Sequence, residues 1–221
     1  MKKAFRIIKC LPWSILFNFH YLPWRKAVKL PILFETVPTF LCLKGNVRIA
    51  SEHISTGMIR FGGRFAPFER RKNVRWQNVG TITFAGNAYF GHHVFISVGE
   101  NAELYIGADS TFSHNVKIIS EDRISLGDKC RVSWDCIIID TDFHPLIDMV
   151  RNKPVQMRAS ILVGNGVWIG HNCVISKGCR LADNITVSSG SVVKGRFKNP
   201  NTIIGGNPAK IWDEGFIRDD V

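Results

Sequence analysis

Aliphatic side chains recur at every sixth position between residues 163 and 193. The series is Val163, Ile169, Ile175, Leu181, Val187 and Val193. An α-helix repeats every 3.6 residues and a strand alternates every two, so a period of six fits neither as one continuous element. It fits short strands that turn a corner every six residues, three to a coil. Coils stacked at roughly 4.8 Å place each aliphatic above another, which predicts a three-sided parallel β-helix.

The same pattern extends upstream with interruptions. Ile106, Phe112, Ile118 and Ile124 keep the six-residue step, and Leu126, Val132 and Ile138 keep a second step shifted by two. The rhythm fails between residues 138 and 163, so we expect a loop that leaves the coil at about 143–160. We assign 1–44 to a separate N-terminal segment, 45–198 to the β-helix domain and 199–221 to a C-terminal tail. Gly164 and Gly170 are expected to supply unusual dihedrals at corners.

Four of the six cysteines share one position of the repeat. Cys130, Cys136, Cys173 and Cys179 each lie two residues before the next aliphatic of their series. This position faces the narrow interior, where cysteine acts as a small hydrophobic residue. The sequence contains no CxxC pair, so we expect these cysteines to pack rather than form disulfides, bind zinc or act as nucleophiles. Reduced cysteines are typical of a cytoplasmic protein.

The positive charge is concentrated at the N-terminus. The formal net charge is +11, and residues 1–29 contain seven lysines and arginines but no acidic residue. The uncharged, aromatic run at 10–24 is too short to span a bilayer, and no signal-peptide cleavage site follows it. Two interpretations stay open, and both can hold: contact with an anionic membrane surface, or a cap over the open end of the coils. We find no motif typical of nucleic-acid binding.

Three short motifs accompany the repeats. They are Val167–Gly170 (VWIG), Asp140–Pro145 (DTDFHP) and Gly205–Ile211, which contains Asn-Pro-Ala-Lys. With the six-residue units, they resemble the hexapeptide-repeat acyltransferases over about residues 81–212. The similarity is to bacterial O-acetyltransferases of capsule and cell-surface polysaccharides, related to galactoside and maltose acetyltransferases. The resemblance implies an all-β, left-handed parallel β-helix and a homotrimer. It also implies that acetyl-CoA binds in clefts between neighbouring chains, with no metal.

The resemblance also assigns a general base. His144 occupies the position of the family's catalytic histidine. A sugar hydroxyl is a poor nucleophile until its proton is removed, and an imidazole with a pKa near 7 suits that task. Asp142 and Asp140 are candidates to orient His144, although either carboxylate could instead cap a loop.

The remaining site residues are carried over by motif. The positions expected to bind acetyl-CoA are Trp168, His171, Ser189, Lys194, Arg196, Pro208 and Lys210. The acceptor positions are Ser113, Asn115 and Trp134, where Ser113 departs from the amide side chain of some relatives. Asp213 stands where some relatives have a basic residue, which puts phosphate contacts there in doubt.

The resulting prediction is acetyl transfer to a sugar hydroxyl in capsule, O-antigen or exopolysaccharide synthesis. The acceptor can be lipid-linked and the protein peripheral at the inner membrane surface. One alternative is a small acceptor such as a free sugar or serine. A second is a metalloenzyme similar to γ-class carbonic anhydrase using His92, His93 and His114, although the pair of histidines five residues apart that this class uses is missing. A third is a non-enzymatic scaffold.

Overall fold

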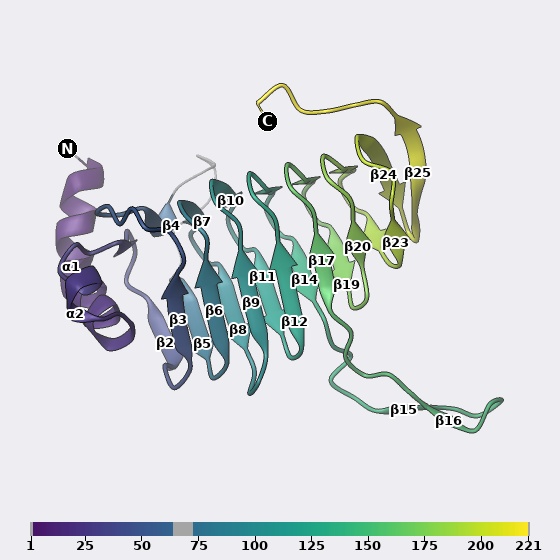
Figure 1. Cartoon of the computed structure of the whole chain (residues 1–221), viewed down its shortest axis with the longest axis horizontal. Coiled ribbons are helices and arrows are strands. Elements are labelled where there is room, and N and C mark those ends of the chain that lie inside the picture. The colour runs from purple at the N-terminus through teal and green to yellow at the C-terminus, as the bar shows by residue number, and fades with distance from the viewer. Residues whose placement is uncertain (1, 64–72, 221) are drawn as a thin grey trace.

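The computed structural model describes residues 2–63 and 73–220, whose strands form three parallel sheets around a prism (Figure 1). Sheet A contains β1 (Ile32–Phe34), β4 (Ile59–Gly63), β7 (Ala88–Gly91), β10 (Ser110–Phe112), β13 (Arg131–Val132), β18 (Trp168–Ile169), β21 (Thr186–Val187), β24 (Thr202–Gly206) and β25 (Ala209–Glu214). Sheet B contains β2 (Thr39–Cys42), β5 (Arg75–Asn78), β8 (Phe95–Val98), β11 (Lys117–Ser120), β14 (Ile137–Ile139), β19 (Val174–Ser176) and β22 (Val192–Val193). Sheet C contains β3 (Asn46–Ile49), β6 (Thr81–Phe84), β9 (Glu103–Ile106), β12 (Arg123–Leu126), β17 (Ile161–Val163), β20 (Arg180–Leu181) and β23 (Arg196–Phe197). The predicted β-helix is therefore confirmed.

The six-residue repeat builds the coils as predicted. Val163 pairs with Leu181, and Ile169 pairs with Val187, so one turn of the prism takes 18 residues here. All six aliphatic positions of the repeat are buried. Each apolar side chain therefore lies directly over its counterpart in the next coil, which removes both from water.

The phase slip upstream has a local cause. Ile124 and Leu126 both point into the prism from β12, because alternate residues of a strand share a face. The strands of sheet C thus supply two inward side chains in these coils, and the turn lengthens to 20 residues, as from Ile118 to its partner Ile138.

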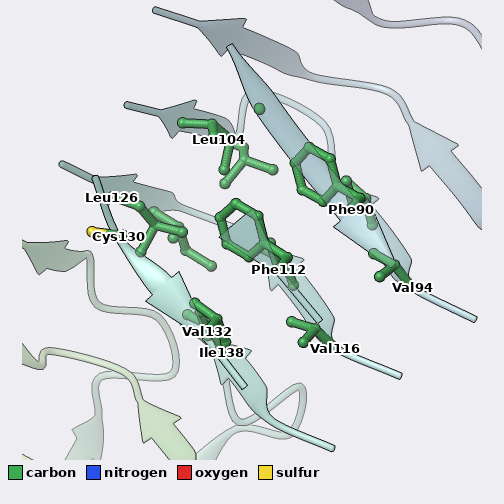
Figure 2. Close-up of a cluster of buried hydrophobic side chains, with 14 of the residues drawn as sticks. Phe90, Val94, Leu104, Phe112, Val116, Leu126, Cys130, Val132 and Ile138 are labelled. Carbon is green, nitrogen blue, oxygen red and sulfur yellow. The ribbon is translucent and has the colours of Figure 1, made fainter. Parts of the chain in front are cut away.

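Aromatic rings fill the wider, N-terminal coils. Phe61, Phe90 and Phe112 occupy equivalent inward positions of sheet A, with ring centroids 4.5 Å and 4.6 Å apart along the stack. Figure 2 shows Phe90 and Phe112 pointing into the interior with the aliphatic side chains of neighbouring coils. In the later coils the same register position is held by Val132 and then Ile169, so aliphatic side chains replace the rings.

The four repeat cysteines lie in this interior, as predicted. Cys130, Cys136, Cys173 and Cys179 are almost fully buried and free of disulfides. Burial raises the pKa of the Cys130 and Cys179 thiols to about 12, so both remain protonated at neutral pH. They act as small core residues.

The prediction that Gly164 and Gly170 supply unusual dihedral angles was wrong. Positive φ angles occur at Gly166 and Gly178 rather than at Gly164 and Gly170. A Cβ on Gly170 would lie 2.7 Å from the backbone nitrogen of Ser189 in the next coil. Gly170 is therefore required by the close approach of two backbones rather than by its dihedral angles.

The N-terminal segment caps the prism. Helix α1 (Lys2–Tyr21) lies across the open end and is followed by α2 (Trp24–Ala27) (Figure 1). Phe17 is fully buried, and its ring packs 5.2 Å from that of Phe34 in β1. The first coil already begins at β1, ahead of residue 45, so part of the expected separate segment belongs to the solenoid. At the other end, β25 pairs antiparallel with β24 inside the expected tail.

A buried amide fastens α1 to the first coil. The Asn18 side chain donates to the carbonyl of Ile32 at 2.7 Å and accepts from its N–H at 3.2 Å. We expect Asn18→Ala to lower the free energy of unfolding by about 2 kcal/mol, because both backbone groups lose their partner. Urea unfolding measures this effect. The matched change at exposed Asn46 should cost under about 0.5 kcal/mol, and equal losses would contradict the role of Asn18.

Candidate functional site

A row of flat side chains follows the edge between sheets A and B. At each turn of the prism the chain leaves sheet A at this A/B edge, and the successive corners carry His92, His114, Trp134 and His171. The centroids are 5.4 Å, 6.0 Å and 4.9 Å apart along the row, and the rings are nearly parallel. Stacked coils therefore convert distant sequence positions into one continuous stack of rings, which is buried at His92 and His114 and partly exposed at Trp134 and His171.

Trp168 extends this row onto sheet A. Its side chain points outward from β18, is 42% exposed and donates from Nε1 to the hydroxyl of Ser133 at 3.2 Å. Ser189 is exposed at the corresponding corner one coil further on. Trp134, Trp168, His171 and Ser189 are thus brought together by the fold.

The two smaller acceptor candidates lie one coil before Trp134. Ser113 is buried, and its backbone N–H donates to Val132 at 2.8 Å. The Asn115 amide donates to the carboxylate of Asp135, the residue after Trp134. Asp135 was not anticipated from sequence, since only the stacking of coils makes it a neighbour of Asn115.

His144 lies on a hairpin that leaves the prism at a different edge. After β14 the chain departs from the B/C edge, forms the antiparallel strands β15 (Leu146–Asp148) and β16 (Lys153–Val155), and returns at β17. The hairpin projects away from the coils (Figure 1), as the broken rhythm predicted. The backbone of Phe143 has φ 61, and His144 itself is exposed.

Asp140 anchors the root of this hairpin. Its buried carboxylate accepts from the Ser120 hydroxyl at 2.9 Å and from the N–H groups of Glu121 and Asp122 at 2.7 and 3.1 Å. Burial raises the pKa of Asp140, and these hydrogen bonds oppose part of that rise. The geometry makes Asp140 a structural anchor rather than a partner of the His144 ring.

Asp142 holds the hairpin by a second link. Lys177, at the same edge one coil later, donates to the Asp142 carboxylate and to the carbonyl of Gln156. One ammonium therefore joins both sides of the hairpin to the prism. Sequence reasoning missed Lys177, because its distance of 35 residues from Asp142 gives no local signal.

The two halves of the predicted site are separate within one chain. The aromatic row follows one edge of sheet B and the His144 hairpin leaves from the opposite edge. The full width of sheet B lies between them.

Comparisons with known proteins identify the fold. The chain is 28% identical to the galactoside O-acetyltransferase of Escherichia coli over 62% of this chain and 66% of that protein. It is 29% identical to the polysialic acid O-acetyltransferase of Neisseria meningitidis over 48% of this chain and 50% of the relative. The crystal structure of the polysialic acid O-acetyltransferase OatWY superposes with a TM-score of 0.54, at 22% identity over 83% of this chain and 91% of that one.

The chain is similar in sequence to sugar O-acetyltransferases. It covers less than two thirds of the length of these two curated relatives. A scan against protein-family models found no match.

The cationic candidates of this hexapeptide-repeat protein are spread over the C-terminal coils. Lys194 is exposed at the B/C edge and Arg196 is exposed on sheet C. Pro208 follows a cis peptide bond in the turn between β24 and β25. Lys210 is exposed on β25 opposite Gly205. Only Lys210 therefore belongs to the sheet that carries Trp168.

Two of the three histidines weighed for a metal site belong to the row. His92 and His114 are fully buried and stacked on each other, whereas His93 is half-buried at a corner with φ 61. Among the residues that the structure describes, no group of three or more potential metal ligands is found.

Proposed function

We propose that this protein transfers an acetyl group from acetyl-CoA to a sugar hydroxyl during synthesis of a cell-surface polysaccharide. The observation that carries the proposal is the placement of an exposed histidine hairpin and of the partly exposed Trp134, His171 and Trp168 side chains on the two edges of one sheet. The named activities of the galactoside and polysialic acid relatives support the same chemistry.

A trimer would join the two halves. The outward face of sheet B is unusually apolar, with half-buried side chains in the single chain: Ile119, Ile137, Ile139, Val174 and Val192. If each prism turns this face toward a threefold axis, its A/B edge meets the B/C edge of the next chain. The interface is then heterologous and closes into a ring. His144 of one chain would reach the Trp134–Trp168 row of its neighbour.

In this arrangement His144 is the general base. Its imidazole takes the proton of the sugar hydroxyl while the oxygen attacks the thioester carbonyl carbon. The new C–O bond forms, the C–S bond breaks, and coenzyme A leaves as the thiol after receiving a proton. Both substrates meet in one cleft, so no acyl-enzyme is required.

The other carried-over residues would bind the two substrates. The exposed face of Trp168 suits the pantetheine arm, with the backbone at His171 and Ser189 alongside it. Lys194, Arg196 and Lys210 offer point charges for phosphates. Trp134 presents a flat apolar surface for a sugar ring, and Asn115 beside it supplies hydrogen bonds.

The hairpin link to Lys177 sets the position of His144. We expect Asp142→Asn to lower kcat about tenfold with little change in KM, because a looser hairpin misplaces the base without touching either substrate. The pH dependence should keep its shape, since His144 remains the general base. Asp148→Asn, farther out on the hairpin, is the control, and a loss dominated by KM would contradict the positioning role.

The direct test supplies acetyl-CoA and a panel of acceptors. The panel contains free sugars, serine, nucleotide sugars, oligosaccharides and lipid-linked glycans. We expect thiol release with polysaccharide fragments or lipid-linked glycans, and a product heavier by one acetyl group. Transfer only to a free sugar or serine would overturn the polysaccharide assignment. If no acceptor in the panel raised the rate of thiol release, the enzyme assignment would be overturned. A lipid-linked acceptor implies a protein peripheral to the inner face of the cytoplasmic membrane.

A further inference from the structure

The outward face of the capping helix is apolar. Ile8, Leu16 and Phe19 point away from the prism and are 66%, 52% and 40% exposed, whereas Phe17 on the opposite side is fully buried. A helix that covers a core normally presents polar residues to water. Here the apolar side chains continue on both faces, so the cap has a second, uncovered contact surface.

The second helix enlarges this surface. Trp24 is 69% exposed and packs edge-on against Phe19, with centroids 5.1 Å apart. Val28 is 48% exposed just after α2. We call Ile8, Leu16, Phe19, Trp24 and Val28 the end face. Contiguous apolar patches of this kind are typical of surfaces that bind a protein or a membrane.

Charge decides between these occupants. Exposed Lys9, Arg25 and Lys29 accompany the end face, and the sequence to residue 29 has no acidic side chain. Apolar aromatic and aliphatic residues next to exposed basic ones match the boundary between acyl chains and anionic headgroups. No helix within the described residues is long and apolar enough to span a bilayer.

We propose that the end face docks on an anionic lipid bilayer and makes the prism stand upright on it. Helix α1 lies across the end of the prism (Figure 1), so its exposed side looks outward along the prism axis. The upright orientation rests on the proposed function only through the trimer that this function requires. In a trimer with its threefold axis along the prisms, three end faces lie in one plane and bind together.

Upright docking fixes the height of the reaction site. Five strand spacings separate β1 from β18 in sheet A, or roughly 24 Å, and α1 adds about 10 Å. Trp168 therefore stands far above the headgroups. A membrane-anchored acceptor reaches it only if several sugars separate the lipid from the acetylated residue, which makes the expected substrate a lipid-linked oligosaccharide.

Vesicle sedimentation tests docking. The full chain should bind phosphatidylcholine vesicles containing phosphatidylglycerol and bind weakly to phosphatidylcholine alone. Lys9→Gln with Arg25→Gln should weaken binding about 30-fold, and Leu16→Ser with Trp24→Ser about 100-fold or more. Ile217→Ser, an equally exposed aliphatic at the other end of the chain, is the control. Failure to bind anionic vesicles, or association beyond the trimer through the end face, would overturn the proposal.

Two further measurements test the orientation. Brominated lipids should quench the fluorescence of Trp24 but leave that of Trp212, near the C-terminal end, unchanged, as read in variants with the other exposed tryptophans replaced by phenylalanine. Quenching of both would mean that the prism lies flat. In vesicles, transfer should require a long lipid-linked glycan, whereas short and long soluble glycans should react alike. Absence of transfer to any soluble glycan would count against the proposed function, while the sedimentation and quenching results would still decide the docking.

Discussion

Replacement of His144 by alanine is expected to lower kcat by a factor on the order of 10²–10⁴, which is the usual contribution of a positioned general base. The side chain is exposed on a projecting hairpin and lies outside the packed core. The substitution should therefore leave the fold, the oligomeric state and the affinity for coenzyme A unchanged. Steady-state thiol release with saturating substrates measures the loss, and calorimetry with coenzyme A checks binding.

His53 provides the matched control for this variant. It is also exposed, but it lies near the N-terminal end of the prism between β3 and β4. His53→Ala should keep full activity. A His144→Ala protein that turns over normally would remove this residue from the mechanism, and an equal loss in both variants would indicate a general effect of removing surface histidines.

The regular coils were predictable because every turn offers the same environment. A residue at the position of Ile169 meets Val132 below and Val187 above it, so its chemistry repeats with the geometry. The first coil gave no such signal. In this coil the pairing of β2 with β5 contains a bulge. On its outer side the coil packs against α1 instead of another coil.

The aromatic row was harder to foresee than the repeat that builds it. Each of its residues looks like an isolated corner residue in the sequence. His114 and Trp134 are one coil apart, but Trp134 and His171 are separated by a coil that includes the hairpin. The spacing therefore depends on a loop whose length the pattern of apolar residues does not set.

The six-residue repeat does not determine how the His144 hairpin meets the aromatic row. Inward residues determine the coil, whereas His144, Asp142 and Lys177 are outward or in loops, where the six-residue pattern carries no information. The motif around His144 predicts the base, but the distance of His144 from Trp168 follows from the edges at which two corners leave the prism. In the proposed trimer, the neighbouring chain brings them together.

Mixed trimers provide a test of that requirement. Trp168→Ala should lower kcat/KM about 30-fold, since loss of the apolar contact with the pantetheine arm costs about 2 kcal/mol, and His144→Ala is nearly inactive for the reason given above. When the two variants are co-expressed in equal amounts, about one quarter of the interfaces in a closed ring pair a native His144 with a native Trp168 of the neighbour. We expect about a quarter of the native activity, well above the mean of the two parents.

Differential tags allow the mixed trimers to be purified and their composition to be measured. Every mixed trimer has one natively paired interface in three, so the purified fraction should reach about a third of the native activity. The same two proteins, purified separately and combined without subunit exchange, give the baseline, which should equal the mean of the parents. Recovery in the mixed trimers alone requires that one chain supplies the base and the next supplies the aromatic row. If the mixed trimers stay at the baseline, each chain holds a complete site, and the hairpin must fold back across sheet B of its own prism.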